Sequence, residues 1–213
     1  MVMYRTHCQR ILDSVSRANF NEVEDFLLHF WQAMPHHLLP VMASTVVVDL
    51  VALCDTILYS VISSVLIISP VQSFPESLLQ DVLKFCGQLG PWLDTALDGL
   101  PETLRHTKQK SATTFVKTLK RQIAIMELAK ATRKALQRED QLSQLFRDWE
   151  GLDMHAVLAH VLFAIQPLSI PSSSLHIIPE LLRQFVELLE DKTSVEDFVE
   201  WGQSILHTTV KQC

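Results

Sequence analysis

The chain has 213 residues, of which 48% are hydrophobic and 20% charged, and its formal net charge is −6. This apolar content excludes an intrinsically disordered chain, and the negative charge disfavours a free-standing nucleic-acid-binding protein. Five Gly and nine Pro leave little material for tight turns or a glycine-rich phosphate loop, which favours long helices.

The elements predicted for the first third of the chain are all helices. Apolar residues recur at helical spacing over 4–15. Asn21 and Glu24 have the spacing of a capping box, which predicts a second helix that stops before Pro35. A third, strongly apolar helix is expected over 45–68.

Start and stop signals divide the middle of the chain. Ser73 can cap a helix that we expect to end at Gly87 or Gly90. A separate short helix is expected over 91–97, because a proline interrupts the helical hydrogen bonds. The next helix is predicted over 102–138, either continuous or broken once.

The last third begins with Asp140, which can cap a helix. A further helix is expected over 153–165, followed by a loop rich in Pro and Ser over 167–179. Two helices, over about 179–190 and 194–210, are predicted to close the chain.

No segment shows the alternation of a half-buried strand, so the predicted fold is all-α. We expect about eight or nine helices in an orthogonal or bundle-like array without a sheet. The predicted organisation is a helical region over 1–166, the loop over 167–179, and a C-terminal helical pair over 180–213. That pair is expected to pack on the same domain.

The apolar segment 46–68 is long enough to cross a bilayer. It contains Asp49 and Asp55, each of which costs roughly 2.5–3.5 kcal/mol at the centre of a membrane helix. We therefore expect a helix buried in a protein core or interface, with no membrane contact. A membrane span is the alternative.

Basic residues are concentrated in one segment. Ten of the 18 lie within 105–138, where Glu127 is the only acid. Helical geometry distributes them over two roughly opposite sides rather than one stripe. This favours a solvated face paired with acidic neighbours, with contact to a partner protein or to nucleic acid as alternatives. The candidate basic patches are Lys110, Lys117 and Arg121 on one side, and Lys130, Arg133 and Lys134 on the other.

The chain lacks the motifs of the common catalytic and metal sites. It contains no GxSxG, GxGxxG, GxxxxGK[ST] or HExxH sequence. Its four cysteines form no CxxC pair, which is typical of reduced thiols in an intracellular protein. We therefore expect no enzyme, no catalytic or metal-binding residue, no cofactor and no small-molecule substrate.

What remains is a surplus of apolar side chains, which need partners inside the fold or on another protein. Sequence alone does not separate core from interface among them. The candidates for a core or dimer-interface role are Phe26, Leu27, Phe30, Trp31, Leu50, Leu53, Ile57, Leu58, Val61, Val65 and Leu66.

Several runs resemble one known family in collinear order. They are YRTHCQRILD, FLLHFWQAMPHHLLP, CDTILYSV, PESLLQDVLKF, LDGLPETLR, LKRQ and SVEDFVEW. These runs resemble the central region of the regulatory factor X (RFX) transcription factors, particularly the branch without a glutamine-rich activation region. The resemblance implies a nuclear protein whose winged-helix domain binds X-box promoter elements. It also implies an extended region that forms dimers with itself or with other RFX proteins.

The chain departs from this family in two respects. It contains no winged-helix sequence, so no DNA-contacting residue is carried over, and promoter DNA is expected to be bound only through a domain not present here. The family pattern continues beyond Cys213, which indicates a fragment, a short isoform or an incomplete gene product. A dimerisation region is the first expectation. A truncated isoform that acts as a dominant-negative partner, or a helical module that touches DNA through 105–138, is the alternative.

Overall fold

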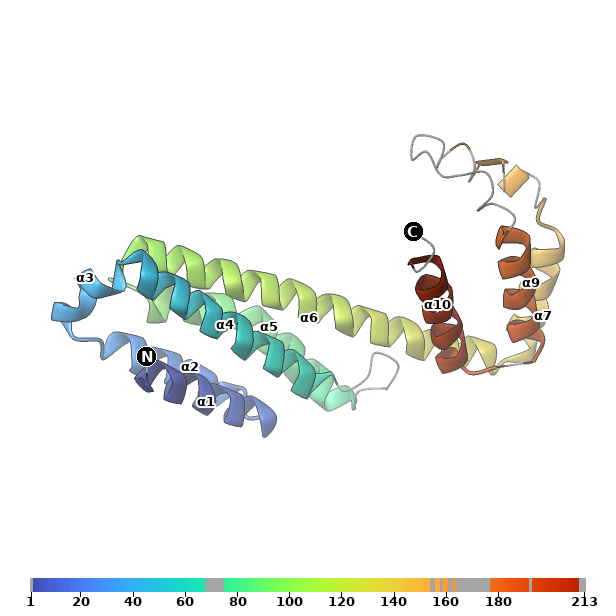
Figure 1. Ribbon diagram of the computed structural model, residues 1–213. Helices are drawn as coiled ribbons and strands as arrows, with labels where there is room; N and C mark the ends of the chain where they lie inside the picture. The colour runs from blue at the N-terminus through green and yellow to red at the C-terminus, as the bar shows by residue number, and fades with distance from the viewer. Residues whose placement is uncertain are drawn as a thin grey trace. The chain divides into compact units, whose positions relative to one another are not determined.

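The computed structural model describes residues 2–67, 75–153, 156–157, 159–160, 163, 177–191 and 193–210 (Figure 1). In these residues it contains nine α-helices and one 3₁₀ helix, and no strand. The predicted all-α class is therefore confirmed.

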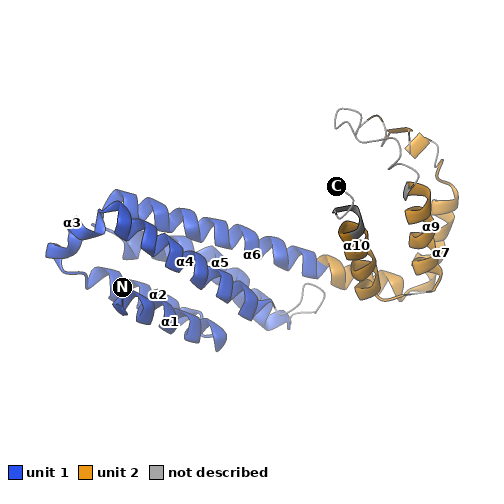
Figure 2. Ribbon diagram, in the orientation of Figure 1, with its two compact units in different colours: residues 1–127 blue, residues 128–213 orange. Residues whose placement is uncertain are grey.

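The chain forms two compact units, residues 1–127 and residues 128–213 (Figure 2). The long helix α6 (Glu102–Leu136) runs through the boundary between them. Most of the predicted 153–165 helix and positions 167–176 of the predicted loop lie outside the described residues.

Unit 1 is a bundle of long helices. Helix α1 packs against α2 and α4, and α2 packs against α5. Between α2 and α4, a 3₁₀ turn and the short α3 carry the chain from one side of the bundle to the other (Figure 1). Besides α6, the helices are α1 (Val2–Ser16), α2 (Asn21–Gln32), α3 (Leu39–Met42), α4 (Thr45–Leu66) and α5 (Glu76–Ala96), with the 3₁₀ turn at His36–Leu38.

The start of α2 differs from the predicted capping box. Asn21 is the first helical residue, and Phe20 before it already has helical backbone angles and makes no side-chain cap. A tight turn in which Ala18 has φ of 60° feeds the helix instead. The hydroxyl of Ser14 stabilises this turn by donating to the carbonyl of Asn19 and to the carboxylate of Glu22. The capping-box prediction was therefore wrong.

Helix α5 continues through Pro91, so the predicted break at Gly87 or Gly90 and the separate helix over 91–97 were also wrong. A proline inside a helix costs about 3 kcal/mol through a lost hydrogen bond and a steric clash. The buried stripe of α5 crosses that position without interruption, with Leu89 before the proline and Trp92 and Leu93 after it. Burial of these side chains, each worth about 1.5–3 kcal/mol, outweighs the penalty.

Helix α6 is unbroken over 35 residues. It contains no Gly or Pro and is rich in Ala, Leu, Lys, Arg and Gln, which have high helix propensity. One stripe of its side chains is buried at spacings of three and four residues: Leu104, Lys108, Ala112, Phe115, Leu119, Ile123 and Met126. The only charged member of that stripe is Lys108.

Unit 2 contains α7 (Glu139–Glu150), α9 (Ile177–Glu190) and α10 (Val195–Val210). Asp140 does not cap α7, because it lies inside the helix and binds Arg138 in an ion pair at 2.8 Å. The residue at the cap position is Arg138, so that prediction was wrong by two positions. Helix α9 begins two residues before the predicted start at position 179.

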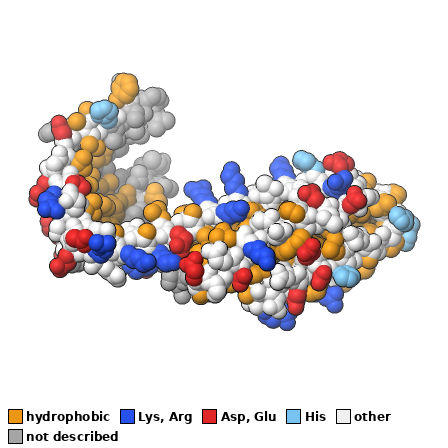
Figure 3. All heavy atoms as spheres, turned by 180° about the vertical axis from the view of Figure 1, so that it is seen from behind, with side chains coloured by type: hydrophobic (Ala, Val, Ile, Leu, Met, Phe, Trp, Pro, Cys, Tyr) orange, Lys and Arg blue, Asp and Glu red, His pale blue; other side chains and the backbone are white. Residues whose placement is uncertain are grey.

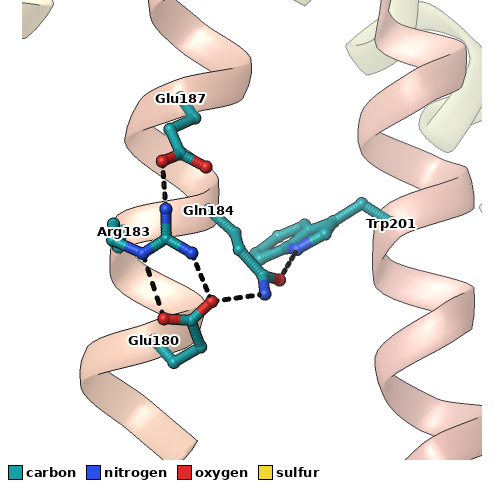
Figure 4. Close-up of polar contacts among 5 residues, drawn as sticks. All are labelled: Glu180, Arg183, Gln184, Glu187 and Trp201. Carbon is teal, nitrogen blue, oxygen red and sulfur yellow. Dashed lines mark hydrogen bonds and ion pairs between the residues drawn. The ribbon is translucent and has the colours of Figure 1, made fainter.

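An aromatic cluster joins the helices of unit 2. The ring of Phe185 on α9 lies 5.2 Å from Trp149 on α7, and 5.6 and 5.9 Å from Phe198 and Trp201 on α10. The indole of Trp201 also donates a hydrogen bond of 2.9 Å to the side chain of Gln184 (Figure 4).

On the exposed side of α9, Arg183 binds both Glu180 and Glu187, as Figure 4 shows. The hydrogen bonds that Glu180 accepts from Arg183 and Gln184 hold the pKa of its carboxyl group down at about 2. The pairs follow helical spacings of three and four residues, which supports α9 as a helix rather than forming a binding site.

Candidate protein-interaction surface

Helix α4 carries large apolar side chains on two opposite sides. On one side, Val51, Leu58 and Ile62 are buried in the core of unit 1. On the other side, six apolar side chains remain between 38% and 66% exposed within the described chain. We call this stripe the α4 face, and it consists of Val46, Leu50, Leu53, Ile57, Val61 and Val65.

The structure separates the eleven predicted core or interface residues into three groups. Leu27, Trp31 and Leu58 are buried in the core. Phe26, Phe30 and Leu66 are partly buried against it. The remaining five belong to the exposed α4 face: Leu50, Leu53, Ile57, Val61 and Val65. Val46 completes that face and was not among the candidates.

A buried polar cluster faces the core on the opposite side of α4. The Lys108 ammonium donates hydrogen bonds of 2.8 and 3.0 Å to the two carboxylate oxygens of Asp55, and one of 2.8 Å to the hydroxyl of Tyr4. Tyr4 in turn donates to Asp55. The ammonium also lies 5.0 Å from the ring centroid of Trp31, a cation–π distance.

This cluster determines the rotation of α4 about its axis. A carboxylate and an ammonium cannot leave water without their partners, so Asp55 must point toward Lys108. The opposite side of the helix, around Ile57, then faces outward. Sequence reasoning missed the pair, although a signal existed, since Lys108 interrupts the apolar spacing between Leu104 and Ala112.

Burial keeps the neighbouring titratable groups neutral. It raises the pKa of Tyr4 and of Tyr59 well above the ordinary value, with the nearby Asp55 carboxylate adding to the effect. Burial also raises the pKa of the Cys8 thiol to about 11 and lowers the pKa of His7 to about 3. None of these groups is therefore poised as a nucleophile or base near pH 7.

A groove of about 690 Å³ lies beside the α4 face, between α4 and α6. Small hydroxyl side chains line much of it: Thr56, Ser60, Ser63 and Ser64 from α4, and Thr107, Ser111, Thr114 and Thr118 from α6. Lys110 stands at its α6 wall. Small side chains allow another polypeptide to approach the two helices closely.

A second hollow, of about 740 Å³, lies between α1 and α2. Phe26 and Phe30 form part of its wall, and Phe30 stacks on the buried ring of His7 at 4.2 Å. Because the two phenylalanines border this hollow, they are only partly buried.

The candidate basic residues are divided between the two units. Lys110, Lys117 and Arg121 are exposed in unit 1, whereas Lys130, Arg133 and Lys134 belong to unit 2. Arg133 forms an ion pair of 2.6 Å with Glu196. On the face drawn in Figure 3, basic and acidic side chains are interspersed. Lys108, a further basic residue of the segment, is buried.

Among the residues that the structure describes, no group of three His, Cys, Asp or Glu side chains could hold a metal ion. In the same residues, α4 is the one helix long and apolar enough to cross a membrane, with a mean hydropathy of 2.0. Core helices of soluble proteins meet the same criterion of length and hydropathy.

Comparison with known proteins gives consistent matches over the whole chain. A family model described as the RFX BCD domain matches residues 1–213. The chain is 42% identical over 210 residues to transcription factor RFX4 of Danio rerio, and 38% identical over 213 residues to DNA-binding protein RFX6 of Homo sapiens. It is 24% identical over 234 residues to DNA-binding protein RFX2 of Mus musculus.

These alignments include 99% of this chain but only 28%, 23% and 32% of the three relatives. The chain therefore spans less than a third of their length. No solved structure matches it.

Proposed function

The chain belongs to the RFX family of transcription factors, which are not enzymes, and from that membership we propose that it is a dimerisation region. In this proposal it pairs with a second copy or with another RFX protein in the nucleus. The pair regulates RNA polymerase II transcription at X-box promoter elements, and a winged-helix domain outside these residues makes the DNA contacts.

The observation that carries the proposal is the exposed α4 face. Soluble monomers rarely expose an apolar patch larger than about 300–600 Å², and the largest such patch is often functional. Six aliphatic side chains in one stripe, without a charge among them, provide a patch of that order. Desolvating it against a protein partner would be favourable, by roughly 25 cal/mol for each Å² buried.

The mechanism is an increase in effective concentration. When two chains are paired, binding of the first DNA-binding domain holds the second near its half-site. The second contact becomes intramolecular, which raises the apparent affinity by roughly 10²–10⁴. No group on the dimerisation region needs to touch DNA for this effect.

Direct DNA contact through the basic residues of α6 is the competing function. It predicts binding by the chain alone whose affinity falls steeply with salt, since each neutralised phosphate releases counterions. The candidate basic residues that are exposed in unit 1 are few, namely Lys110, Lys117 and Arg121. Arg133 in unit 2 already has an acidic partner. These observations favour protein pairing.

Sedimentation equilibrium of the purified chain over a wide concentration range tests the proposal. We expect a reversible dimer, with twice the 24.2 kDa mass of the chain. A well-folded monomer at all concentrations, with no exchange into another RFX protein, would overturn it. A gel shift at two salt concentrations tests the competing function on the same sample.

A further inference from the structure

We propose that a second copy of this chain packs antiparallel across the α4 face, so that Asp49 of each copy meets Lys117 and Arg121 of the other. This inference rests on the proposed dimerisation function and adds its geometry. It follows from the shape of the stripe, the register of α4 against α6, and the positions of the charges.

The α4 face can pair with itself. Its six side chains extend from Val46 to Val65, and the midpoint lies between Leu53 and Ile57. A two-fold axis through that midpoint places each apolar side chain against another, because the stripe is apolar on both sides of it. The two ends of the stripe are thereby buried together rather than left in water.

The register of α6 beside α4 is known from two contacts. Both helices run in the same direction in unit 1 (Figure 1). Asp55 binds Lys108, and the ring of Tyr59 stacks on that of Phe115 at 4.6 Å. Phe115, whose ring stacks on that of Tyr59, sets the level used here. Since helices rise 1.5 Å per residue, Lys117 lies about 3 Å, and Arg121 about 9 Å, beyond Phe115 along α6.

The charges beside the stripe are opposite at its two ends. Asp49 is exposed in the first turns of α4. It lies on the side of the helix that carries Ala52, Thr56 and Ser60, which line the groove against α6. Lys117 and Arg121 are exposed on α6 toward the other end.

Only one of the two symmetric arrangements brings these charges together. In the antiparallel arrangement both α6 helices lie on the same side of the paired α4 helices. Asp49 and Lys117 are about equally far, roughly 10 Å, from the midpoint along the helices, so each meets the other copy's counterpart. In a parallel arrangement Asp49 would lie level with Asp49 of the other copy, and the α6 helices would lie on opposite sides.

The antiparallel arrangement also brings one pair of like charges near each other. Lys110 lies near the level of the axis at the wall of the groove, so its counterpart is nearby. A lysine can keep its ammonium in water at the rim while its stem covers apolar surface. The two Asp49 contacts at the ends therefore decide the orientation.

A charge exchange in the full chain tests the arrangement. Asp49→Lys alone, and Lys117→Glu with Arg121→Glu alone, each create like-charge contacts at both ends of the antiparallel pair. We expect each homodimer to dissociate roughly tenfold more readily, as for reversed charges at an interface rim. Mixing the two variants restores opposite charges at both ends, so we expect the mixed dimer to regain the wild-type affinity.

Two further variants serve as references. Glu24→Lys reverses a charge in the first turn of α2, on another helix, and should leave the dimer unchanged. Leu53→Asp with Ile57→Asp places two charges in the exposed α4 face and should abolish the dimer while the far-ultraviolet circular dichroism and melting temperature stay close to wild type.

The outcomes separate this inference from the proposed function. Recovery in the mixed sample supports the antiparallel arrangement. An unchanged dimer for Asp49→Lys alone overturns it, because in a parallel arrangement this variant only replaces one pair of like charges with another. A dimer that resists Leu53→Asp with Ile57→Asp also overturns it, although dimerisation itself then stands. A monomeric wild-type chain overturns both.

Discussion

The ammonium group of Lys108 donates two hydrogen bonds to the carboxylate of Asp55, at 2.8 and 3.0 Å, although 53 residues separate them in the chain. Their side chains are only 3% and 1% exposed. The pair joins α4 to α6, and the hydroxyl of Tyr4 brings α1 into the same cluster. Three helices therefore meet at one polar point inside a mostly apolar core.

Removing one member of this pair should lower the free energy of unfolding much more than replacing both members. Asp55→Ala or Lys108→Met leaves an unpaired charge in the core, and we expect each to lower the free energy of unfolding by about 3–5 kcal/mol. Asp55→Leu combined with Lys108→Met should recover much of that loss. Urea denaturation followed by circular dichroism measures all three.

Arg138→Ala, which breaks an exposed ion pair, is the matched control and should leave the urea midpoint unchanged. Equal and additive losses for the two single variants and the double variant would contradict a coupled buried pair.

Stability should fall as the pH is lowered below about 6.5, because of His7. Burial lowers the pKa of His7 to about 3 in the folded chain, whereas the unfolded chain binds the proton near pH 6.5. The unfolded state therefore gains a proton first, and the folded state loses about 1.4 kcal/mol per pH unit between these values.

Urea denaturation between pH 6.5 and pH 5, before most carboxylates titrate, measures this slope. In His7→Leu the slope should be reduced by about that amount. A slope that is the same in His7→Leu and the wild type would show that His7 is not the group responsible.

Truncation of two adjacent aliphatic residues on α4 should change the stability of the fold by very different amounts. Leu58 is 7% exposed and packs in the core, so Leu58→Ala should cost about 2–5 kcal/mol of unfolding free energy. Ile57 is 56% exposed, so Ile57→Ala should change the stability of the monomer by no more than about 0.5 kcal/mol. Measurement at a protein concentration below dimer formation separates folding from pairing. Similar losses for both variants would contradict the rotation of α4 described above.

Pro91 lies inside α5 and is tolerated rather than required. Pro91→Ala restores the backbone amide that the carbonyl of Gly87 lacks, and no special backbone conformation has to be kept. We expect the variant to be more stable by about 1–3 kcal/mol, because a proline inside a helix costs roughly 3 kcal/mol relative to alanine. The shift in thermal midpoint measures it. A decrease in stability would mean that the proline ring makes a packing contact that outweighs the hydrogen bond.

Local patterns were enough to predict the helices with few errors. The apolar spacing and the scarcity of Gly and Pro predicted an all-α chain, and the third predicted helix, over 45–68, corresponds to α4 over Thr45–Leu66. The errors lay at caps and at Pro91. At the start of α2, a turn stabilised by Ser14 replaced the predicted cap. At Pro91, the burial of Trp92 and Leu93 outweighed the tendency of proline to end a helix.

The orientation of α4 was decided only by tertiary structure. Its sequence carries large aliphatic residues both on the side of Leu58 and on the side of Ile57, so their spacing does not distinguish these two sides. The distinction comes from Asp55, whose partner Lys108 is brought to it by the packing of another helix. The sequence by itself determined that α4 would be a helix in need of burial. The cost of leaving a buried charge unpaired decided which side entered the core, and which side was left exposed for a partner.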